Sequence, residues 1–461
     1  MSTPAFKPSA LRRLSTALKL GKTPTPSAPD VSSLANFLVT AKEKYLSDIR
    51  ATPSKGGEWT VVMGNEAGDL DSVASSIAYA WIQSEIQKRP SIPVIQIARD
   101  DLNLRAENIH ALKLAGINDP AQQLLSVTEI QDVKPFPSNT FALVDHNRLG
   151  GAFSTENPSA NVIAVIDHHE DEHLHPDADP RIVAPAGSCS SHVANLYPRD
   201  AEMPTELAIL LLSAILIDTG GLRAGGKALQ PDHDAAAYLI PLSTLRSSMS
   251  PSTLSILSKQ PPPNPAMFAD IPEVKQLSDD LAAKKSDVSH LGAWDLLRRD
   301  YKEYTYTLNW HPATPAIKAG LATVPVKLKS WGSGGTLEGE AQRWMEHQGL
   351  SVLGVLTSFR DAGKLKLGGS GKGKHRREMA WFVRDAEAQG LQLDALAARL
   401  WKGLEGSEEL KVTRHKRMSL SSSAGVPPGV RAMVYKQGNA DATRKTTAPL
   451  LKNIMESTES S

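Results

Sequence analysis

The chain has 461 residues, of which 41% are hydrophobic and 22% are charged, which is typical of a soluble globular protein with room for two domains. No apolar run approaches the roughly 20 residues that a membrane-spanning helix needs, so we expect no membrane partner. The single cysteine, Cys189, excludes an internal disulfide framework and favours a reducing compartment, which predicts a cytoplasmic location.

The net charge of +1 conceals an uneven distribution. Residues 291–461 hold 26 Lys and Arg against 17 Asp and Glu. The first 290 residues therefore carry a charge of about −8. An acidic half could hold cations and a basic half could hold anions, although charged faces are usually only solvated ones.

Residues 1–29 contain no acidic side chain and are rich in Ser, Thr, Pro and basic residues. We therefore expect residues 1–30 to precede the folded part, either as a disordered tail or as a targeting segment. In the second case the protein would be mitochondrial. Residues 31–49 show helical spacing, with Leu34, Phe37 and Leu38 on one face, and predict a helix packed on the sheet that follows.

From Trp59 onward, strand-like and helix-like segments alternate regularly. The predicted strands are residues 60–64, 92–98, 140–144, 162–166 and 181–184, and the predicted helices are residues 71–87, 108–114 and 205–217. This alternation predicts an α/β fold with a doubly wound, mainly parallel sheet over residues 31–240.

Three of these predicted strands end in polar side chains. The first leads into residues 65–71 (NEAGDLD), the second into residues 145–147 (DHN) and the third into residues 167–169 (DHH). Open α/β sheets bind their ligands at the carboxyl ends of their strands, so these groups should meet at one edge. Carboxylates packed together repel one another unless a cation compensates them, and the convergence therefore predicts a metal site.

The loop after the first strand carries two carboxylates, Asp69 and Asp71, separated by one residue. Both can point into the crevice, and Asp145 could bridge two cations at the end of a neighbouring strand. Two divalent ions roughly 3.5 to 4 Å apart are the usual arrangement for activating a water and stabilising phosphoryl oxygens. A lone Asp-x-Asp is more often a loop and helix N-cap pair, but three converging strand ends favour the metal site.

Four segments resemble the four motifs of the DHH phosphoesterase superfamily in their order and relative spacing. They are residues 65–72 (NEAGDLDS), 144–147 (VDHN), 166–169 (IDHH) and 214–219 (AILIDT). The chain looks like the fungal cytosolic exopolyphosphatases, which are relatives of family II inorganic pyrophosphatases and prune proteins. Residues 187–191 (GSCSS) also resemble a segment that follows the DHH triplet in exopolyphosphatases.

The resemblance implies two divalent cations, Mg²⁺ or Mn²⁺. One would be bound by Asp69 and Asp145, and the second by Asp71, Asp145, His168 and Asp218. Asp218 follows the apolar helix predicted over residues 205–217, so we expect its charge to be buried away from water, where it needs a partner. An ion pair with a nearby basic residue such as Arg223 is the structural alternative to metal binding.

The resemblance also implies that His169 faces the substrate phosphate and that Asp167 holds an imidazole in its ligating tautomer. Ser188 would lie beside the metal ligands. Asn65 stands where pyrophosphatases of the family have a metal-binding histidine, and an amide oxygen should shift the preference toward Mg²⁺ from Mn²⁺. Prune-like proteins usually lack the second histidine of the triplet, so His169 favours the exopolyphosphatase branch.

Residues 241–287 are rich in Pro and Ser in their first part and predict an interdomain connection that ends in a helix over residues 275–287. A smaller C-terminal α/β domain is expected over residues 288–455, across a cleft. Its predicted strands are residues 304–308, 316–324 and 352–358, and its predicted helices are residues 336–348, 377–388 and 393–400.

This second part resembles the DHHA2 domain through residues 297–302 (LRRDYK), 356–360 (LTSFR) and 442–445 (ATRK). The resemblance implies that Lys302, Arg444 and Lys445 contact substrate phosphates, since Arg offers a fork that fits phosphate oxygens and Lys a compact charge. The Gly- and Lys-rich residues 364–377, which include Arg377, could lay backbone N–H groups on a polyanion or form a solvated hairpin tip.

Together these features predict a metal-dependent exopolyphosphatase that removes terminal phosphate from inorganic polyphosphate with a water activated by two metal ions. The alternatives are an inorganic pyrophosphatase, a prune-like phosphodiesterase, and a non-catalytic metal-binding scaffold. We expect polyphosphate or pyrophosphate as substrate and no nucleic acid, because the basic loops lack interleaved aromatic residues. The oligomeric state stays open.

Overall fold

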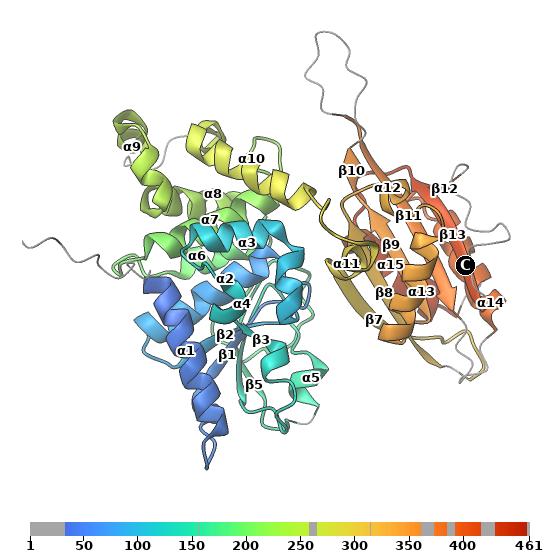
Figure 1. Ribbon diagram of the computed structural model, residues 1–461, viewed down its shortest axis with the longest axis horizontal. Coiled ribbons are helices and arrows are strands. Elements are labelled where there is room, and N and C mark those ends of the chain that lie inside the picture. The colour runs from blue at the N-terminus through green and yellow to red at the C-terminus, as the bar shows by residue number, and fades with distance from the viewer. Residues whose placement is uncertain are drawn as a thin grey trace, which may run out of the picture.

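The computed structural model describes residues 33–155, 157–257, 265–313, 315–360, 373–384, 392–415 and 429–458. The expected tail at residues 1–30 and most of the Gly- and Lys-rich segment therefore lie outside the described residues. Figure 1 shows two lobes, with the first part of the chain in blue to green and the last part in orange to red. None of the helices described is long and apolar enough to cross a bilayer.

The N-terminal lobe is built on a six-stranded sheet in the order β3-β2-β1-β4-β5-β6. All its strand pairs are parallel, which confirms the predicted doubly wound sheet. The strands are β1 (Thr60–Met63), β2 (Ser91–Ile95), β3 (Leu125–Ser126), β4 (Thr140–Val144), β5 (Asn161–Asp167) and β6 (Arg181–Val183). The strand order reverses between β1 and β4, and such a switch point is where these sheets place their ligand crevice.

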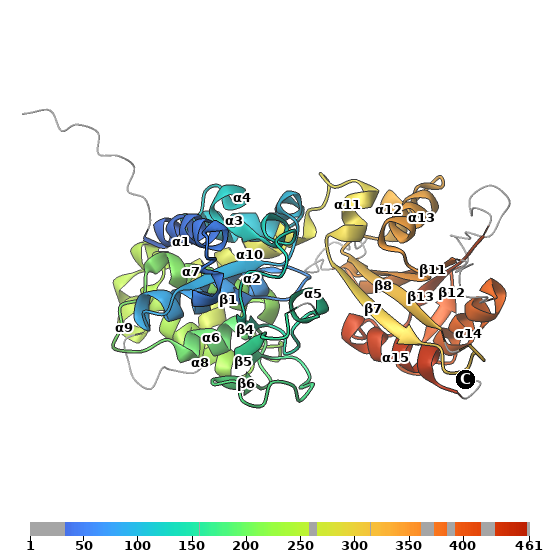
Figure 2. The ribbon, with the colours of Figure 1, turned by 90° about the horizontal axis from the view of Figure 1, so that it is seen from below.

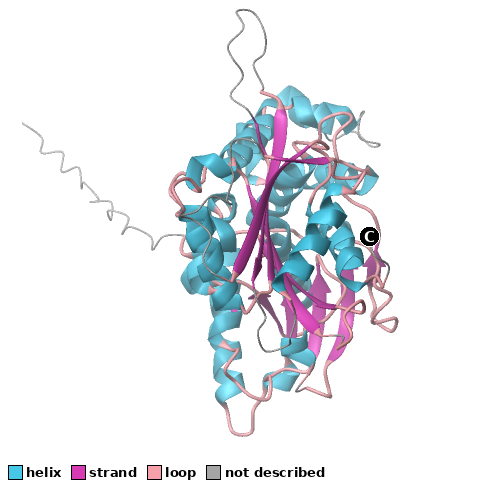
Figure 3. Cartoon of the chain, turned by 90° about the vertical axis from the view of Figure 1, so that its right-hand side faces the viewer, coloured by secondary structure: helices cyan, strands magenta, loops and turns pink. Residues whose placement is uncertain are grey.

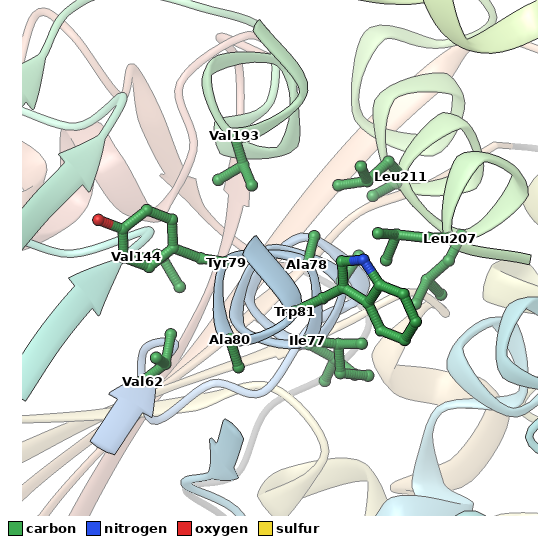
Figure 4. Close-up of a cluster of buried hydrophobic side chains, with 14 of the residues drawn as sticks. Val62, Ile77, Ala78, Tyr79, Ala80, Trp81, Val144, Val193, Leu207 and Leu211 are labelled. Carbon is green, nitrogen blue, oxygen red and sulfur yellow. The ribbon is translucent and has the colours of Figure 1, made fainter. Parts of the chain in front are cut away.

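Helices pack in layers on this sheet. They are α1 (Ser33–Arg50), α2 (Leu70–Trp81), α3 (Ala106–Leu114), α4 (Pro120–Gln123), α5 (Gly151–Ser154), α6 (Cys189–Leu196), α7 (Thr205–Thr219) and α8 (Gln230–Leu239). Short turns lie at η1 (Gly56–Glu58), η3 (Arg99–Leu104) and η4 (Val127–Glu129), and η2 (Ile82–Ile86) prolongs α2. Every residue of α2 is buried, because the helix lies between the sheet on one side and α6 and α7 on the other (Figure 4).

The described part of the segment expected to connect the two domains forms four short helices or helical turns and one helix of 15 residues, α10. They are η5 (Ile240–Leu242), η6 (Thr244–Ser248), α9 (Pro251–Leu257), η7 (Pro265–Asp270) and α10 (Pro272–Ser286). The last of them, α10, packs against α3 and α7 of the N-terminal lobe and then leads into the second lobe (Figure 2).

The C-terminal lobe contains a seven-stranded mixed sheet along the path β12-β13-β11-β9-β8-β7, with β10 paired to β11. Only β8 and β9 run parallel within it. The strands are β7 (Tyr301–Thr307), β8 (Ala316–Val324), β9 (Val352–Thr357), β10 (Phe359–Arg360), β11 (His375–Arg384), β12 (Val412–Arg414) and β13 (Val430–Gln437). The helices are α11 (Ala293–Arg298), α12 (Leu328–Trp331), α13 (Thr336–Gln348), α14 (Leu393–Glu405) and α15 (Arg444–Glu456). Figure 3 shows the chain from the side of this lobe, with helices in cyan and strands in magenta.

One predicted element is wrong. Residues 377–388 were expected to be a helix, but the described part of this segment belongs to the central strand β11. Trp381 and Val383 enter one hydrophobic core, and Phe382 enters the core on the opposite face of the sheet. This alternation with a period of two residues is the pattern of a strand buried on both faces, and pairing with β9 and β13 overrides the local helical propensity.

The other predicted elements are confirmed with small shifts at their ends. The strand at residues 316–324 and the helix at residues 336–348 have the expected limits. The edge strand β7 begins three residues before the expected 304, and β13 was not predicted at all. Boundaries shift in this way because tertiary hydrogen bonds, rather than local pattern, decide where pairing stops.

Candidate active site

A pocket of about 440 Å³ lies between the two lobes, at the carboxyl edge of the parallel sheet. It brings together all but three of the predicted site residues. Its lining is Asn65, Ala67, Asp69, Asp71, Asp145, His168, His169, Ala186, Gly187, Asp218, Lys227, Lys302, Thr443, Arg444 and Lys445.

Asp145 follows β4 and is at the centre of the acidic wall. Its backbone has φ of +60°, which lies in the left-handed region. Its Oδ2 accepts hydrogen bonds from Asn65 Nδ2 at 2.7 Å and Ser72 Oγ at 2.6 Å. Its Oδ1 is buried and has no hydrogen-bond partner among the described residues.

The two histidines after β5 face this unpartnered oxygen. His168 Nε2 lies 3.3 Å from Asp145 Oδ1, and His169 Nδ1 lies 3.6 Å from it. The Nδ1 atom of His168 is 3.0 Å from the carbonyl of Ala186, to which it can donate, so Nε2 is available as a ligand atom. The ligand atoms of these three residues all lie within 4.8 Å of one another.

Asp167 lies behind the histidines rather than in the pocket. Its Oδ1 accepts the backbone N–H groups of His168 and His169 at 2.8 and 3.2 Å and contacts His169 Nδ1 at 2.8 Å. Asp167 therefore orients the ring of His169, while Ala186 orients that of His168. Burial raises the pKa of Asp167, but the contact with His169 outweighs it and lowers the pKa to about 2.

Asp71 is 2% exposed and is held by the start of α6. It accepts the backbone N–H groups of Cys189 at 2.6 Å and Ser190 at 2.8 Å, and the hydroxyl of Ser188 at 2.7 Å. Ser188, one of the predicted residues outside the lining, thus acts through Asp71. The first turn of a helix stabilises a carboxylate because its N–H groups have no partner within the helix.

Asp69 and Asp218 complete the acidic wall. Asp69 Oδ1 accepts the backbone N–H of Ser72 at 3.1 Å, so Asp69 is the N-cap of α2 and also lines the pocket. The predicted alternative, an ion pair of Asp218 with a nearby basic residue, is present, but its partner is Lys285 and not Arg223, which pairs with Asp279 at 3.0 Å. Asp218 lies 3.7 Å from Lys285 Nζ, at the surface of the pocket.

The electrostatics of this wall fit divalent cations. Burial and the charges of Asp71 and Asp69 raise the pKa of Asp145 well above its ordinary value. Burial lowers the pKa of His168, but Asp145 and Asp71 outweigh it and raise this pKa to about 10. Without cations, protons must compensate these carboxylates. The buried Asp145 Oδ1, which accepts no hydrogen bond from the described residues, and the nitrogen and oxygen donors around it suit Mn²⁺ or Mg²⁺.

The opposite wall is basic and comes from the C-terminal lobe. Lys302 lies on β7, and Arg444 and Lys445 form the first turn of α15. Arg444 Nη1 donates to Asp300 Oδ1 at 2.8 Å and to the Asp300 carbonyl at 3.1 Å, which fixes the guanidinium. A helix N-terminus that carries two cations favours a phosphate group in front of it.

Arg377 is, with Asp167 and Ser188, the third predicted residue that does not line the pocket. Its Nε donates instead to the Ala440 carbonyl at 2.6 Å. Lys227 lines the pocket from the N-terminal lobe and was not predicted. Its only signal in the sequence is its position in a glycine-rich turn after the Asp218 motif. Thr443, the N-cap of α15, was also missed as a lining residue.

Comparison with known proteins agrees with this architecture. Residues 59–215 match the model of the DHH family, N-terminal domain, and residues 279–454 match that of the DHHA2 domain. The chain is 27% identical to the "Putative exopolyphosphatase" of Schizosaccharomyces pombe, over 92% of this chain and 98% of that protein.

Two further relatives cover different shares of the chain. Exopolyphosphatase PRUNE1 of Mus musculus is 29% identical over 90% of this chain and 79% of its own length. The "Probable manganese-dependent inorganic pyrophosphatase" of Enterococcus faecalis is 26% identical over 39% of this chain and 54% of its own length. The chain therefore contains a DHH-family N-terminal domain, which is followed by a DHHA2 domain.

Proposed function

We propose that this protein is a phosphoanhydride hydrolase that removes terminal phosphate from inorganic polyphosphate in the presence of two divalent cations. The observation that carries the proposal is the pocket itself, where acidic and imidazole ligands from three strand ends face three cations of the other lobe. The relatives named exopolyphosphatase support the same class of reaction.

In this proposal, Asp69, Asp71, Asp145, His168 and Asp218 hold the cations. When bound, two divalent cations supply Lewis-acid stabilisation to the phosphate oxygens and to the attacking water.

The protein's own groups position the reacting atoms. Asn65 and Ser72 hold one oxygen of Asp145 so that the other faces the histidines. Asp167 accepts the Nδ1–H of His169, which leaves the other ring nitrogen for the substrate phosphate.

The basic wall binds the substrate. Lys302, Arg444 and Lys445 neutralise the phosphate oxygens as negative charge builds up on them during transfer. Asp300 holds Arg444 in place, so the guanidinium needs little reorganisation when a phosphate arrives.

The direct test is Asp145→Asn. Loss of this carboxylate should reduce phosphate release from long-chain polyphosphate about a hundredfold or more, with Mg²⁺ and Mn²⁺ each supplied. Asp177→Asn is the matched control, because Asp177 is exposed in the same lobe and should leave the rate unchanged. Equal rates for Asp145→Asn and the parent protein would contradict the proposed role of the pocket.

A pyrophosphatase is the second candidate, favoured by the relative named as a manganese-dependent inorganic pyrophosphatase. Rates on polyphosphate, pyrophosphate and cyclic AMP, measured side by side, distinguish it from an exopolyphosphatase and from a prune-like phosphodiesterase. A protein that binds Mn²⁺ and hydrolyses none of the three would instead be a metal-binding scaffold.

We also propose a cytoplasmic location, based on the single cysteine. Cell fractionation followed by N-terminal sequencing of the isolated protein tests it. Recovery from mitochondria without residues 1–29 would favour the targeting segment instead.

A further inference from the structure

Asp232, near the start of α8, is a fully buried carboxylate that forms no ion pair with any described residue. Its two oxygens accept four hydrogen bonds. Oδ2 accepts from the backbone N–H groups of Gly187 at 2.8 Å and Leu229 at 2.7 Å. Oδ1 accepts from the Ser188 N–H at 3.2 Å and the Ser191 hydroxyl at 2.6 Å. A buried charge is costly, so a carboxylate kept here without a cationic partner calls for an explanation.

Three of these four donors belong to one turn, residues 186–191, and the same turn holds two predicted metal ligands from its other side. The carbonyl of Ala186 accepts from His168 Nδ1 at 3.0 Å. The Cys189 N–H and the Ser188 hydroxyl donate to Asp71 at 2.6 and 2.7 Å. Asp232 thus contacts neither ligand itself but fixes the segment that contacts both.

The fourth donor ties a second segment to the same carboxylate. Leu229 lies two residues after Lys227, which lines the pocket. The two segments approach closely at Gly187. A Cβ atom there would lie 2.8 Å from Asp232 Oδ2, 2.6 Å from Thr219 Cγ2 and 3.1 Å from the Lys227 carbonyl. Only glycine fits, so the turn rests directly on Asp232 and on the Lys227 backbone.

We propose that Asp232 is a positioning residue of the active site. Through residues 186–191 it sets the positions of Asp71 and His168 for cation binding, and through Leu229 it sets the position of Lys227 in the lining of the pocket. The inference rests on the proposed function, because it takes Asp71 and His168 to be metal ligands.

Asp232→Asn tests the proposal with little change of volume. An asparagine presents an NH₂ group to at least one of the backbone N–H donors, so one donor loses its acceptor and the turn loosens. The Mn²⁺ dissociation constant of the metal-free protein, measured by titration calorimetry, should rise about tenfold or more, as is usual when a group supporting a metal ligand is lost. The rate at saturating Mn²⁺ should fall less than the affinity.

Ser191→Ala removes a single one of the four hydrogen bonds and should raise the same constant about two- to tenfold. It decides the question if Asp232→Asn does not fold. Ser213→Ala is the control, since this buried hydroxyl in α7 donates only to the Ile209 carbonyl at 2.7 Å. It should lower stability without changing Mn²⁺ affinity.

The outcomes separate the two claims. If the parent protein binds Mn²⁺ and both Asp232→Asn and Ser191→Ala bind it equally well, the positioning role is overturned and the proposed function stands. If the parent protein binds neither Mn²⁺ nor Mg²⁺, the proposed function fails and this inference fails with it.

Discussion

Asp145 combines a strained backbone with a carboxylate whose two oxygens have different surroundings. A left-handed conformation costs a non-glycine residue about 1–3 kcal/mol and persists only where neighbouring groups hold it. Here the hydrogen bonds from Asn65 and Ser72 hold one oxygen, and the other is left facing His168. These hydrogen bonds therefore leave one oxygen at the position where a cation is expected.

At the opposite wall, Asp300 fixes Arg444. Burial raises the pKa of Asp300, but the guanidinium groups of Arg444 and Arg105 outweigh it and hold this pKa below its ordinary value. A carboxylate with a lowered pKa stabilises the fold above its unfolded pKa of about 4, and the contribution is lost as the pH falls through the lower folded value.

Asp300→Asn should therefore cost about 2 kcal/mol of unfolding free energy at pH 7, the usual contribution of a charged hydrogen bond. The difference between parent and variant, measured by urea denaturation, should shrink as the pH falls below about 4, where Asp300 takes up a proton in the unfolded parent but still carries its charge in the folded parent. Asp394→Asn is the control, since its pair with Arg431 is exposed and contributes little. A difference that stays constant from pH 3 to 7 would contradict this account.

Among the elements, α2 and α7 determine where the acidic wall lies. Asp69 caps α2, Asp71 lies in its first turn, and Asp218 lies in the last turn of α7. Both helices are buried nearly all round and pack on each other, so the ligands they carry cannot shift without disturbing the core.

Leu211→Ala in the middle of α7 should lower the unfolding free energy by about 2–5 kcal/mol, because it leaves a cavity beside α2 (Figure 4). Urea denaturation, followed through the transition in which the N-terminal lobe unfolds, measures this loss of free energy. Leu114→Ala at the exposed end of α3 should change stability by less than about 0.5 kcal/mol. Equal losses for the two variants would show that α7 is not the tightly packed element described.

At the scale of the whole molecule, a buried ion pair joins the two lobes where they contact each other. Arg299 of the C-terminal lobe donates to Glu107 at 2.7 Å and to the Leu104 carbonyl at 3.0 Å, and both charged side chains are at most 5% exposed. Arg105 donates to the Ala67 carbonyl at 2.8 Å and lies 3.7 Å from Asp300. The contact between the lobes is thus connected to the loop of Asp69 and to the support of Arg444.

Glu107→Gln leaves the buried guanidinium of Arg299 without its counter-charge and should destabilise the interface by about 3–5 kcal/mol. We expect the first transition in thermal unfolding to occur at a lower temperature. We also expect a higher KM for polyphosphate, because the basic wall loses its fixed position. Arg223→Gln, at the exposed pair with Asp279, should cost less than about 1 kcal/mol and leave KM unchanged. An unchanged KM in Glu107→Gln would show that the pair does not orient the lobes.

The sequence by itself determined the parallel sheet and the chemistry at its edge. Strand residues with period-two or continuous apolar character are local signals, and the polar residues that follow them must lie at the carboxyl ends of parallel strands. The sequence alone therefore predicts that Asp69, Asp145 and His168 lie together, and the resemblance extends the prediction to Lys302 and Arg444.

Only the tertiary structure decided the features that depend on contacts between distant segments. Whether β11 was a strand depended on β9 and β13, which lie far from it in the chain. The roles of Asp232 and Lys227 and the pairing of Glu107 with Arg299 likewise join residues that no local pattern relates. Periodicity reports only which face of an element is buried, whereas the partner of a buried charge is chosen by the packing of the whole chain.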